Sequence, residues 1–295
     1  MSTLYRTIGL TAKIHLEDKD RVLRPVLDAI ASSGATVAVD PHTLGDVTCL
    51  KDAPRIGDVG SIDLIVAVGG DGTILRTIRE LHPIAAPIVA INAGSVGFLS
   101  EMPLADVPER LPRLLAGGGS IERRSCLHAD VVRDGKIVFS CTALNDVVIS
   151  QGTISRLLDL SASVSGQFLA TYHADGLIVA TPTGSTAYSL AAGGPVVHPV
   201  VPALILTPIN PHGFTQKPIV LPSDAPIDVS IAGDVPFFAN ATVGLTVDGQ
   251  VYHELAPGDR VTVKSGHVVQ FLRENDNAFY RALREKLKWG ESLED

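Results

Sequence analysis

The first third of the chain alternates between two hydrophobic periodicities. Short apolar or β-branched runs predict strands, and apolar positions three and four residues apart between them predict amphipathic helices. The run from Ile62 to Val68 is almost entirely apolar, as is typical of a strand covered on both faces. This alternation predicts an α/β domain with a mostly parallel sheet. In chain order, the predicted strands are 7–10, 36–39, 62–68 and 87–91, and the predicted helices are 22–30 and 74–81.

Two residues mark the ends of the first predicted helix. Pro25 falls inside the apolar pattern, and because proline has no amide hydrogen we expect the helix to start late or to kink there. Gly34 is the expected C-terminal stop, since glycine adopts the left-handed conformation that ends many helices.

The pattern changes after a glycine-rich segment at 116–120, which predicts a linker. Beyond it the helical periodicity fades, and two-residue turn signals predict antiparallel hairpins. The second half should therefore be a β-rich, sandwich-like domain. The three turn signals are Asp134-Gly135, Ser165-Gly166 and Asp248-Gly249.

The end of the chain returns to helical spacing. Phe279, Leu283 and Leu287 form an i, i+4, i+8 stripe that predicts a final helix from Asn277 to about Trp289. That stripe has to be buried, and we expect the helix to return to the N-terminal domain. The predicted domains are therefore 1–119, with 275–295 packing back on it, and 120–274.

Length and charge narrow the function classes. At 295 residues two domains are expected, and 45% apolar against 19% charged residues excludes a disordered chain. The formal net charge of −8 disfavours nucleic acid and anionic membranes as partners. The longest apolar stretch, 84–99, is too short and too interrupted to span a bilayer.

Cysteine and histidine usage adds two expectations. The chain has three cysteines, an odd number without a CxxC pair, which predicts a reducing compartment, and the N-terminus lacks a signal-peptide core; we therefore expect a cytoplasmic protein. The nine histidines show no paired ligand spacing, so no protein-built metal site is predicted.

The first candidate for chemistry is the loop Gly69-Gly70-Asp71-Gly72-Thr73 between a predicted strand and a predicted helix. Free amide groups at a helix start bind anions, and glycines allow close approach of a phosphate and positive φ angles. It is not a Walker A loop because no lysine follows. A carboxylate among phosphates is costly, so Asp71 should accept a proton from, or hold, an attacking hydroxyl. The competing interpretation is a tight turn in which Asp71 caps the helix.

A second candidate is the hydroxyl-rich segment from Thr181 to Ser189. Small residues can leave backbone amides and hydroxyls available to a ligand, and Tyr188 offers an aromatic face for a base or nicotinamide ring. A Ser/Thr-rich turn explains the composition equally well.

A third candidate is the pair Asn145-Asp146, in which an amide and a carboxylate could hold the two hydroxyls of a ribose. Taken alone, a turn or β-bulge is the simpler interpretation. Asp175-Gly176, just before an apolar run, is similarly open.

Together these motifs resemble those of NAD kinases, in order and spacing, over most of the chain. That family makes NADP by phosphorylating the 2′-hydroxyl of the adenosine ribose of NAD. The GGDGT loop also occurs in diacylglycerol and sphingosine kinases and, in related form, in phosphofructokinases. The stretch from Asp175 through 181–195 is more specific to NAD kinases.

The resemblance implies Asp71 as the catalytic base and Asn145 and Asp146 as the ribose-binding pair. The acid after Asn145 is Asp where Glu is commoner, which shortens its reach by one methylene, and Gly213 stands where a larger residue is usual. The remaining positions implied to contact nucleotide or phosphate are Gly69, Gly70, Gly72, Thr73, Arg76, Arg156, His173, Asp175, Thr186, Ala187, Tyr188, Ser189, Leu190, Ala191 and Gln250.

The implied substrates are NAD as acceptor and ATP, or polyphosphate, as phosphoryl donor. A divalent ion, Mg²⁺ by its chemistry, should accompany the donor because few lysines lie near the motifs. The resemblance also implies a homodimer or homotetramer.

Two alternative functions stay open: a lipid kinase sharing the GGDGT loop, and a non-catalytic NAD(P)-binding sensor. The residues do not choose between ATP and polyphosphate, between NAD and NADH, or between a dimer and a tetramer, and they say nothing of feedback by NADP(H).

Overall fold

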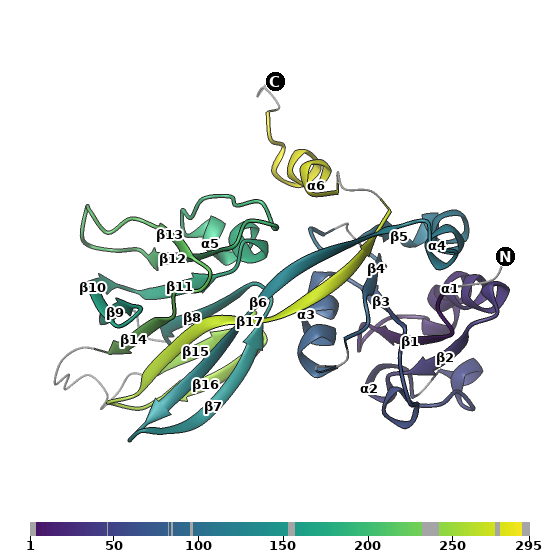
Figure 1. Ribbon diagram of the computed structural model, residues 1–295, viewed down its shortest axis with the longest axis horizontal. Coiled ribbons are helices and arrows are strands. Elements are labelled where there is room, and N and C mark those ends of the chain that lie inside the picture. Colours follow the sequence, from purple (N-terminus) through teal and green to yellow (C-terminus); the bar gives the residue numbers. More distant parts are fainter. Residues whose placement is uncertain are drawn as a thin grey trace. The chain divides into compact units, whose positions relative to one another are not determined.

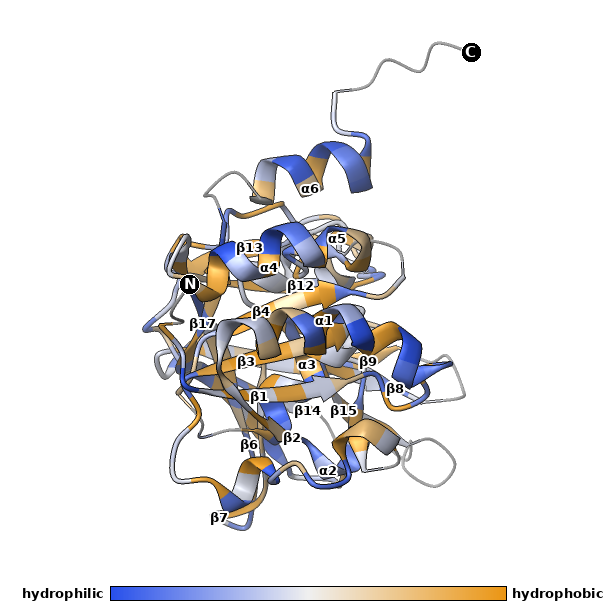
Figure 2. Ribbon diagram, turned by 90° about the vertical axis from the view of Figure 1, so that its right-hand side faces the viewer, coloured by the Kyte–Doolittle hydropathy of each residue, from blue (hydrophilic) through white to orange (hydrophobic). Residues whose placement is uncertain are grey.

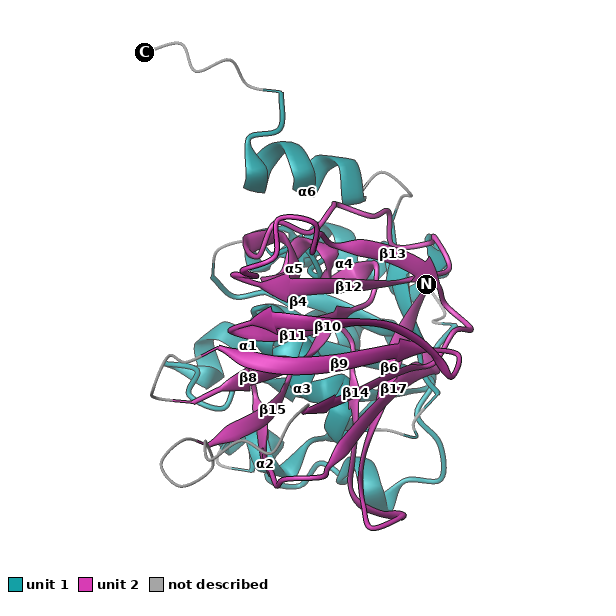
Figure 3. Cartoon of the chain, turned by 90° about the vertical axis from the view of Figure 1, so that its left-hand side faces the viewer, with its two compact units in different colours: residues 1–123, 269–295 teal, residues 124–268 magenta. Residues whose placement is uncertain are grey.

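Figure 1 shows the computed structural model, which describes residues 4–45, 47–81, 83, 85–94, 97–152, 157–231, 242–274 and 278–290. The chain forms two compact units: residues 1–123 with 269–295, called unit 1, and residues 124–268, called unit 2 (Figure 3). The chain passes between them inside two long strands, whereas the sequence placed the boundaries at the glycine-rich segment and just before the last helix.

Unit 1 is the predicted α/β domain. Its strands lie in the order β4-β3-β1-β2, and every pair in that series is parallel. β3 is buried at all six positions, as its apolar run predicted, and β1 and β3 are coloured as mainly hydrophobic in Figure 2. The prediction of a mostly parallel sheet is confirmed. The bounds are β1 Thr7–Ala12, α1 Lys19–Ser33, β2 Thr36–Val39, α2 Pro41–Leu44, β3 Leu64–Gly69, α3 Asp71–Glu80, β4 Ile88–Asn92, β5 Met102–Pro103 and α4 Val107–Leu115.

Helix α1 shows where one local signal was wrong and another was correct. The helix begins at Lys19 and runs through Pro25, so the expected late start is wrong. Burial of Leu23, Val26 and Ile30 in the core of unit 1 offsets the single hydrogen bond that proline removes. Gly34 ends the helix at φ 80°, as predicted.

Unit 2 is β-rich, as predicted. A six-stranded antiparallel sheet in the order β13-β12-β11-β8-β15-β16 shares one hydrophobic core with strands β10, β9 and β14 and parts of β6 and β17. The outer face of β8, β11 and β12 is covered by Ala192 and Val197. The bounds are β6 Ser120–Arg133, β7 Lys136–Ala143, β8 Asp146–Gln151, β9 Leu158–Val164, β10 Gln167–Ala174, β11 Gly176–Ala180, α5 Tyr188–Ala191, β12 Ala203–Ile209, β13 Ile219–Pro222, β14 Ile227–Ile231, β15 Val243–Val247, β16 Val251–Leu255 and β17 Arg260–Arg273.

The three predicted hairpins are confirmed. Each two-residue turn has φ near 50° at its first residue and between 64° and 76° at its glycine. This double positive φ matches the right-handed twist of the strands that it joins. The turns connect β6 to β7, β9 to β10 and β15 to β16.

The last helix, α6, spans Ala278–Leu287 and belongs to unit 1. Phe279 and Leu283 of its apolar stripe are buried. Across the described ranges, no helix is long and apolar enough to cross a membrane.

Candidate active site

The GGDGT loop stands at the carboxyl end of a central parallel strand. β3 ends at Gly69 and α3 begins at Asp71, so the loop occupies the edge at which open α/β sheets bind ligands. The sequence placed this junction correctly, because a buried apolar run followed by glycines and a helical stripe leaves little choice.

The Asp71 carboxylate is held by backbone amides from another loop. The N–H groups of Phe98 and Leu99 donate to its two oxygens at 2.9 and 3.3 Å. Gly97 makes this approach possible, because a Cβ at that position would overlap the Asp71 carboxylate. An ionised carboxylate has about four acceptor sites, so both oxygens keep capacity for a further hydrogen bond or a proton. Asp71 is thus fixed in position and still able to act as a base.

The loop glycines act differently from the expectation. None of Gly69, Gly70 and Gly72 is among the described glycines with positive φ, so left-handed backbone is not their reason. A Cβ at Gly69 would overlap the Thr73 side chain, whereas a Cβ at Gly70 would meet nothing within 4 Å. Gly70 therefore leaves space that the chain itself does not use.

Two side chains near the loop differ from what the sequence indicated. Arg76 is buried in unit 1, where its guanidinium lies within 3.4 Å of Asp40 and 2.5 Å of Glu80.

Asn92 lies opposite Gly69 in the sheet, and the sequence analysis did not single it out. Its side-chain oxygen accepts the Gly94 amide at 2.5 Å. Its signal was a polar residue ending a buried strand.

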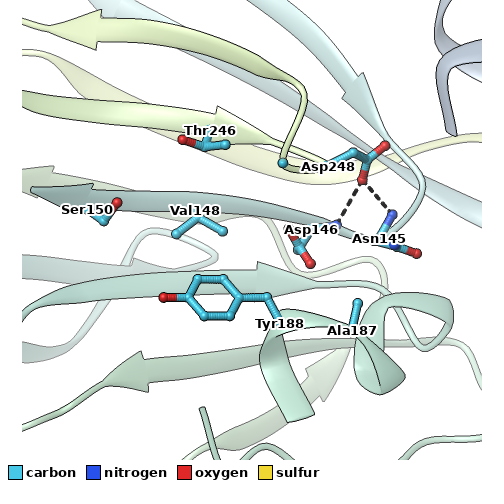
Figure 4. A pocket seen from close by; sticks show the side chains of 9 residues that line it. Asn145, Asp146, Val148, Ser150, Ala187, Tyr188, Thr246 and Asp248 are labelled. Atoms are coloured by element: carbon cyan, nitrogen blue, oxygen red, sulfur yellow. Dashed lines mark hydrogen bonds between the residues drawn. The ribbon is translucent and has the colours of Figure 1, made fainter. Parts of the chain in front are cut away.

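Unit 2 contains a pocket of about 320 Å³, a size at the low end for small-molecule sites. It brings together four residues that the sequence had indicated separately, Asn145 and Asp146 at the start of β8 and Ala187 and Tyr188 at the start of α5 (Figure 4). The described lining residues are Asn145, Asp146, Val148, Ser150, Ala187, Tyr188, Thr246, Asp248 and Gly249.

Asp146 is an acid of this pocket whose pKa is strongly raised. The residue is 4% exposed, and burial, followed by the neighbouring Asp248 carboxylate, raises its pKa to about 7. A hydrogen bond from the Tyr188 backbone partly offsets this rise in the pKa. Asp146 can therefore change its charge near neutral pH, a property common at functional sites.

Comparison with known proteins decides the family. The ATP-NAD kinase N-terminal domain matches residues 33–119, and the ATP-NAD kinase C-terminal domain matches residues 144–272. The chain belongs to the NAD kinase family. An NAD kinase of Koribacter versatilis is 38% identical over 97% of this chain and 99% of its own length, and one of Moorella thermoacetica is 40% identical over 98% and 91%.

The fold agrees with solved members of the family. The crystal structure of yeast NADH kinase complexed with NADH superposes with a TM-score of 0.84 at 26% identity, covering 98% of this chain and 89% of that one. An NAD kinase from Archaeoglobus fulgidus in complex with ATP gives 0.71 at 24% identity, covering 96% and 98%. The second likeness concerns the fold alone.

The hydroxyl-rich segment of the family motif is largely engaged within unit 2. Thr181 donates to the Leu144 carbonyl at 2.6 Å, Ser185 donates to the Pro182 carbonyl at 2.6 Å, and the Ser189 hydroxyl lies 2.9 Å from that of Thr207. These bonds tie the segment to itself, to the residue that follows β7 by one position and to β12, so the hydroxyl-rich composition serves the fold more than the sequence indicated. Ala187 and Tyr188 are its contributions to the pocket.

Four further predicted positions, in this segment or directly after it, do not line the pocket. Thr186 donates to the Thr183 carbonyl at 3.2 Å, and Ser189 bonds Thr207 as described. Leu190 and Ala191 complete the short helix α5.

The remaining predicted contacts are spread over unit 2. Asp175 accepts a hydrogen bond from the Asn210 side chain at 2.9 Å, and the His173 ring bonds Asp159. Gln250 follows Gly249 of the pocket directly and donates its backbone amide to the Val247 carbonyl at 2.9 Å. Arg156 lies outside the described residues.

Proposed function

We propose that the protein transfers the γ-phosphate of ATP to the 2′-hydroxyl of the adenosine ribose of NAD, giving NADP. Membership of the NAD kinase family supports the reaction class. The observation that carries the proposal is the Asp71 carboxylate, fixed by two backbone amides with acceptor capacity left on both oxygens.

In this mechanism Asp71 accepts the proton of the 2′-hydroxyl. The ribose oxygen bonds to the γ-phosphorus, the bond from that phosphorus to the bridging oxygen breaks, and ADP leaves. Phosphoryl transfer has a loose transition state, so positioning and charge stabilisation carry most of the catalysis. The open space at Gly70 suits close approach of a phosphate to backbone amides at the start of α3.

The donor set suits a magnesium ion held mainly by the nucleotide. No group of three or more His, Cys, Asp or Glu side chains that could bind a metal occurs among the described residues. Mg²⁺ commonly keeps several waters and binds to substrate phosphates, so an ion that arrives with ATP would need few protein ligands. When bound, the ion would neutralise charge on the phosphates.

The pocket of unit 2 is proposed to hold a ribose of NAD. Asn145 and Asp146 would bond the ribose hydroxyls, and the Tyr188 ring would pack against the dinucleotide. An ionised Asp146 accepts from both hydroxyls, whereas a protonated one loses part of that capacity.

We also propose an oligomeric state and a cellular location. A homodimer or homotetramer follows from the family resemblance, and light scattering that finds a fully active monomer at micromolar concentration would contradict it. All three cysteines are free thiols, as expected for the reducing cytoplasm that we propose.

An NADP-formation assay across donors and acceptors tests the reaction. We expect NADP from NAD with ATP, and the same assay measures other nucleoside triphosphates, polyphosphate and NADH. Phosphorylation of a lipid alcohol in place of NAD would favour the lipid-kinase alternative. NAD binding without ATP-dependent NADP formation would favour the sensor.

A further inference from the structure

The tip of the β15–β16 hairpin carries a carboxylate that reaches another strand connection. Asp248 accepts hydrogen bonds from the backbone N–H groups of Asn145 and Asp146, at 2.8 and 3.2 Å (Figure 4), and from that of Leu144 at 3.0 Å. Its own backbone amide donates to the Asp146 carbonyl at 2.9 Å. Four hydrogen bonds therefore join one turn residue to the three residues that lead into β8.

We propose that Asp248 is a positioning residue that fixes the Asn145–Asp146 pair in its substrate-binding orientation, an inference that rests on the proposed function. The two carboxylate oxygens of Asp248 accept different hydrogen bonds. Oδ2 accepts from the Leu144 amide, and Oδ1 accepts from the Asn145 and Asp146 amides. Hydrogen bonds from three consecutive amides to one charged acceptor fix the backbone from which both side chains project.

The turn itself does not require this carboxylate. The β6–β7 hairpin places Asp134 at the equivalent turn position and the β9–β10 hairpin places Ser165 there, each with φ of 50°, as for Asp248. Asp134 is exposed, whereas Asp248 is 8% exposed and faces backbone amides. A buried acid at this turn thus has a role beyond the hairpin.

The same carboxylate acts on Asp146 electrostatically. After burial, Asp248 is the second cause of the raised pKa of Asp146. Two further titratable groups among the described residues lie near the pair: the Tyr188 hydroxyl, from α5, and the Cys126 thiol, from β6, whose pKa is raised to about 12 by burial and then by Asp248. The described pocket lining contains no Lys, Arg or His. Removing the charge of Asp248 should therefore lower the pKa of Asp146.

The decisive variant is Asp248→Asn, with Asp134→Asn as the matched control. Asparagine tolerates the left-handed turn equally well, but it replaces one accepting oxygen with a donor facing backbone N–H groups. We expect the KM for NAD to rise about tenfold or more in Asp248→Asn while kcat stays within about threefold. The pH at which the KM for NAD changes should move below 7. Asp134→Asn should match the wild type in all three.

Amide hydrogen exchange provides a readout that needs no nucleotide. We expect exchange at residues 144–146 to be at least about tenfold faster in Asp248→Asn than in Asp134→Asn. Asp248→Ser, which copies the β9–β10 turn, should give the same result and serves if the Asn variant does not fold. Should neither fold, unprotected Leu144 and Asn145 amides in the wild type would overturn the proposal.

The other possible results distinguish failure of the positioning role from failure of the proposed function. Wild-type exchange and a wild-type KM in folded Asp248→Asn, or equal effects in both hairpins, would overturn the positioning role. A wild-type enzyme that forms no NADP would overturn the proposed function, and the exchange comparison would still decide whether Asp248 holds the turn.

Discussion

The two units hold their key acids in opposite ways. In unit 1, Asp71 is half-buried and receives two amide hydrogen bonds from a neighbouring loop. In unit 2, Asp146 is buried beside a second carboxylate, and it is Asp248, not Asp146, that accepts the backbone amides of the turn. The first arrangement leaves an acid available for proton transfer. The second arrangement keeps Asp146 near its charge transition, so its charge and its hydrogen-bonding capacity change around neutral pH.

Replacing the acid of unit 1 should have the largest effect. We expect Asp71→Asn to lower kcat by about 10²–10⁴-fold, the usual range for loss of a general base, with a small change in the KM for NAD. Steady-state kinetics of NADP formation measure both. Turnover close to wild type in a variant with an unchanged melting temperature would remove Asp71 from the base role.

Displacing the same acid without removing it should have the next largest effect. A Cβ at Gly97 would overlap the Asp71 carboxylate, so Gly97→Ala should shift Asp71 and lower kcat by about 10²-fold. Gly94→Ala is the matched control, since its Cβ would lie 3.8 Å from the nearest atom, the Asn92 side-chain oxygen. Equal kinetics in the two variants would show that catalysis does not need the hydrogen bonds from the Phe98 and Leu99 amides to Asp71.

The acid of unit 2 should make NAD binding depend on pH. With a pKa of about 7, Asp146 is mostly protonated at pH 6 and mostly ionised at pH 8, so the KM for NAD should be about tenfold higher at pH 6. Asp146→Asn should have a KM that does not vary over this interval. A flat wild-type profile would mean that the charge of Asp146 does not matter for NAD.

The same residue should affect stability with a defined sign. Folding raises the pKa of Asp146 from its ordinary value of 3.8 to about 7. The contribution of Asp146 to the free energy of unfolding is therefore fully present below about pH 4 and is lost as the pH rises to about 7. Relative to the wild type, Asp146→Asn should gain on the order of 4 kcal/mol at pH 8, the energy that corresponds to a pKa shift from 3.8 to about 7. Chemical denaturation at pH 5 and pH 8 measures the difference, and a variant less stable at pH 8 would contradict it.

Alanine substitutions at the adjacent glycines Gly69 and Gly70 should have the smallest effects, and these should differ in kind. Gly69→Ala forces the Thr73 side chain to move and should cost about 1–3 kcal/mol of stability. Gly70→Ala should leave the melting temperature unchanged but raise the KM for ATP several-fold, because its Cβ enters space that we assign to phosphate. Thermal unfolding and ATP titration of both variants test this, and a destabilised Gly70→Ala with a normal KM would reverse the assignment.

Much of the architecture could be predicted because its causes are local. A buried apolar run followed by glycines and a helical stripe fixed the junction at Asp71, and dipeptides such as Asp248-Gly249 fixed the hairpins through their positive φ. The late start expected from Pro25 was wrong because the penalty of one missing hydrogen bond is local, whereas the burial that offsets it depends on the whole unit.

The sequence by itself determined the alternation of strands and helices in unit 1 and the three two-residue hairpin turns, because periodicity and backbone preferences act between near neighbours. Only the tertiary structure decided what those motifs contact. It showed that the hydroxyls of 181–189 bond mostly within unit 2, that Arg76 pairs with Asp40 and Glu80, and that Asp248 reaches across 102 residues to the Asp146 amide. Hydrogen bonds and burial depend on distances in space between residues far apart in the chain, and no single stretch of sequence records those distances.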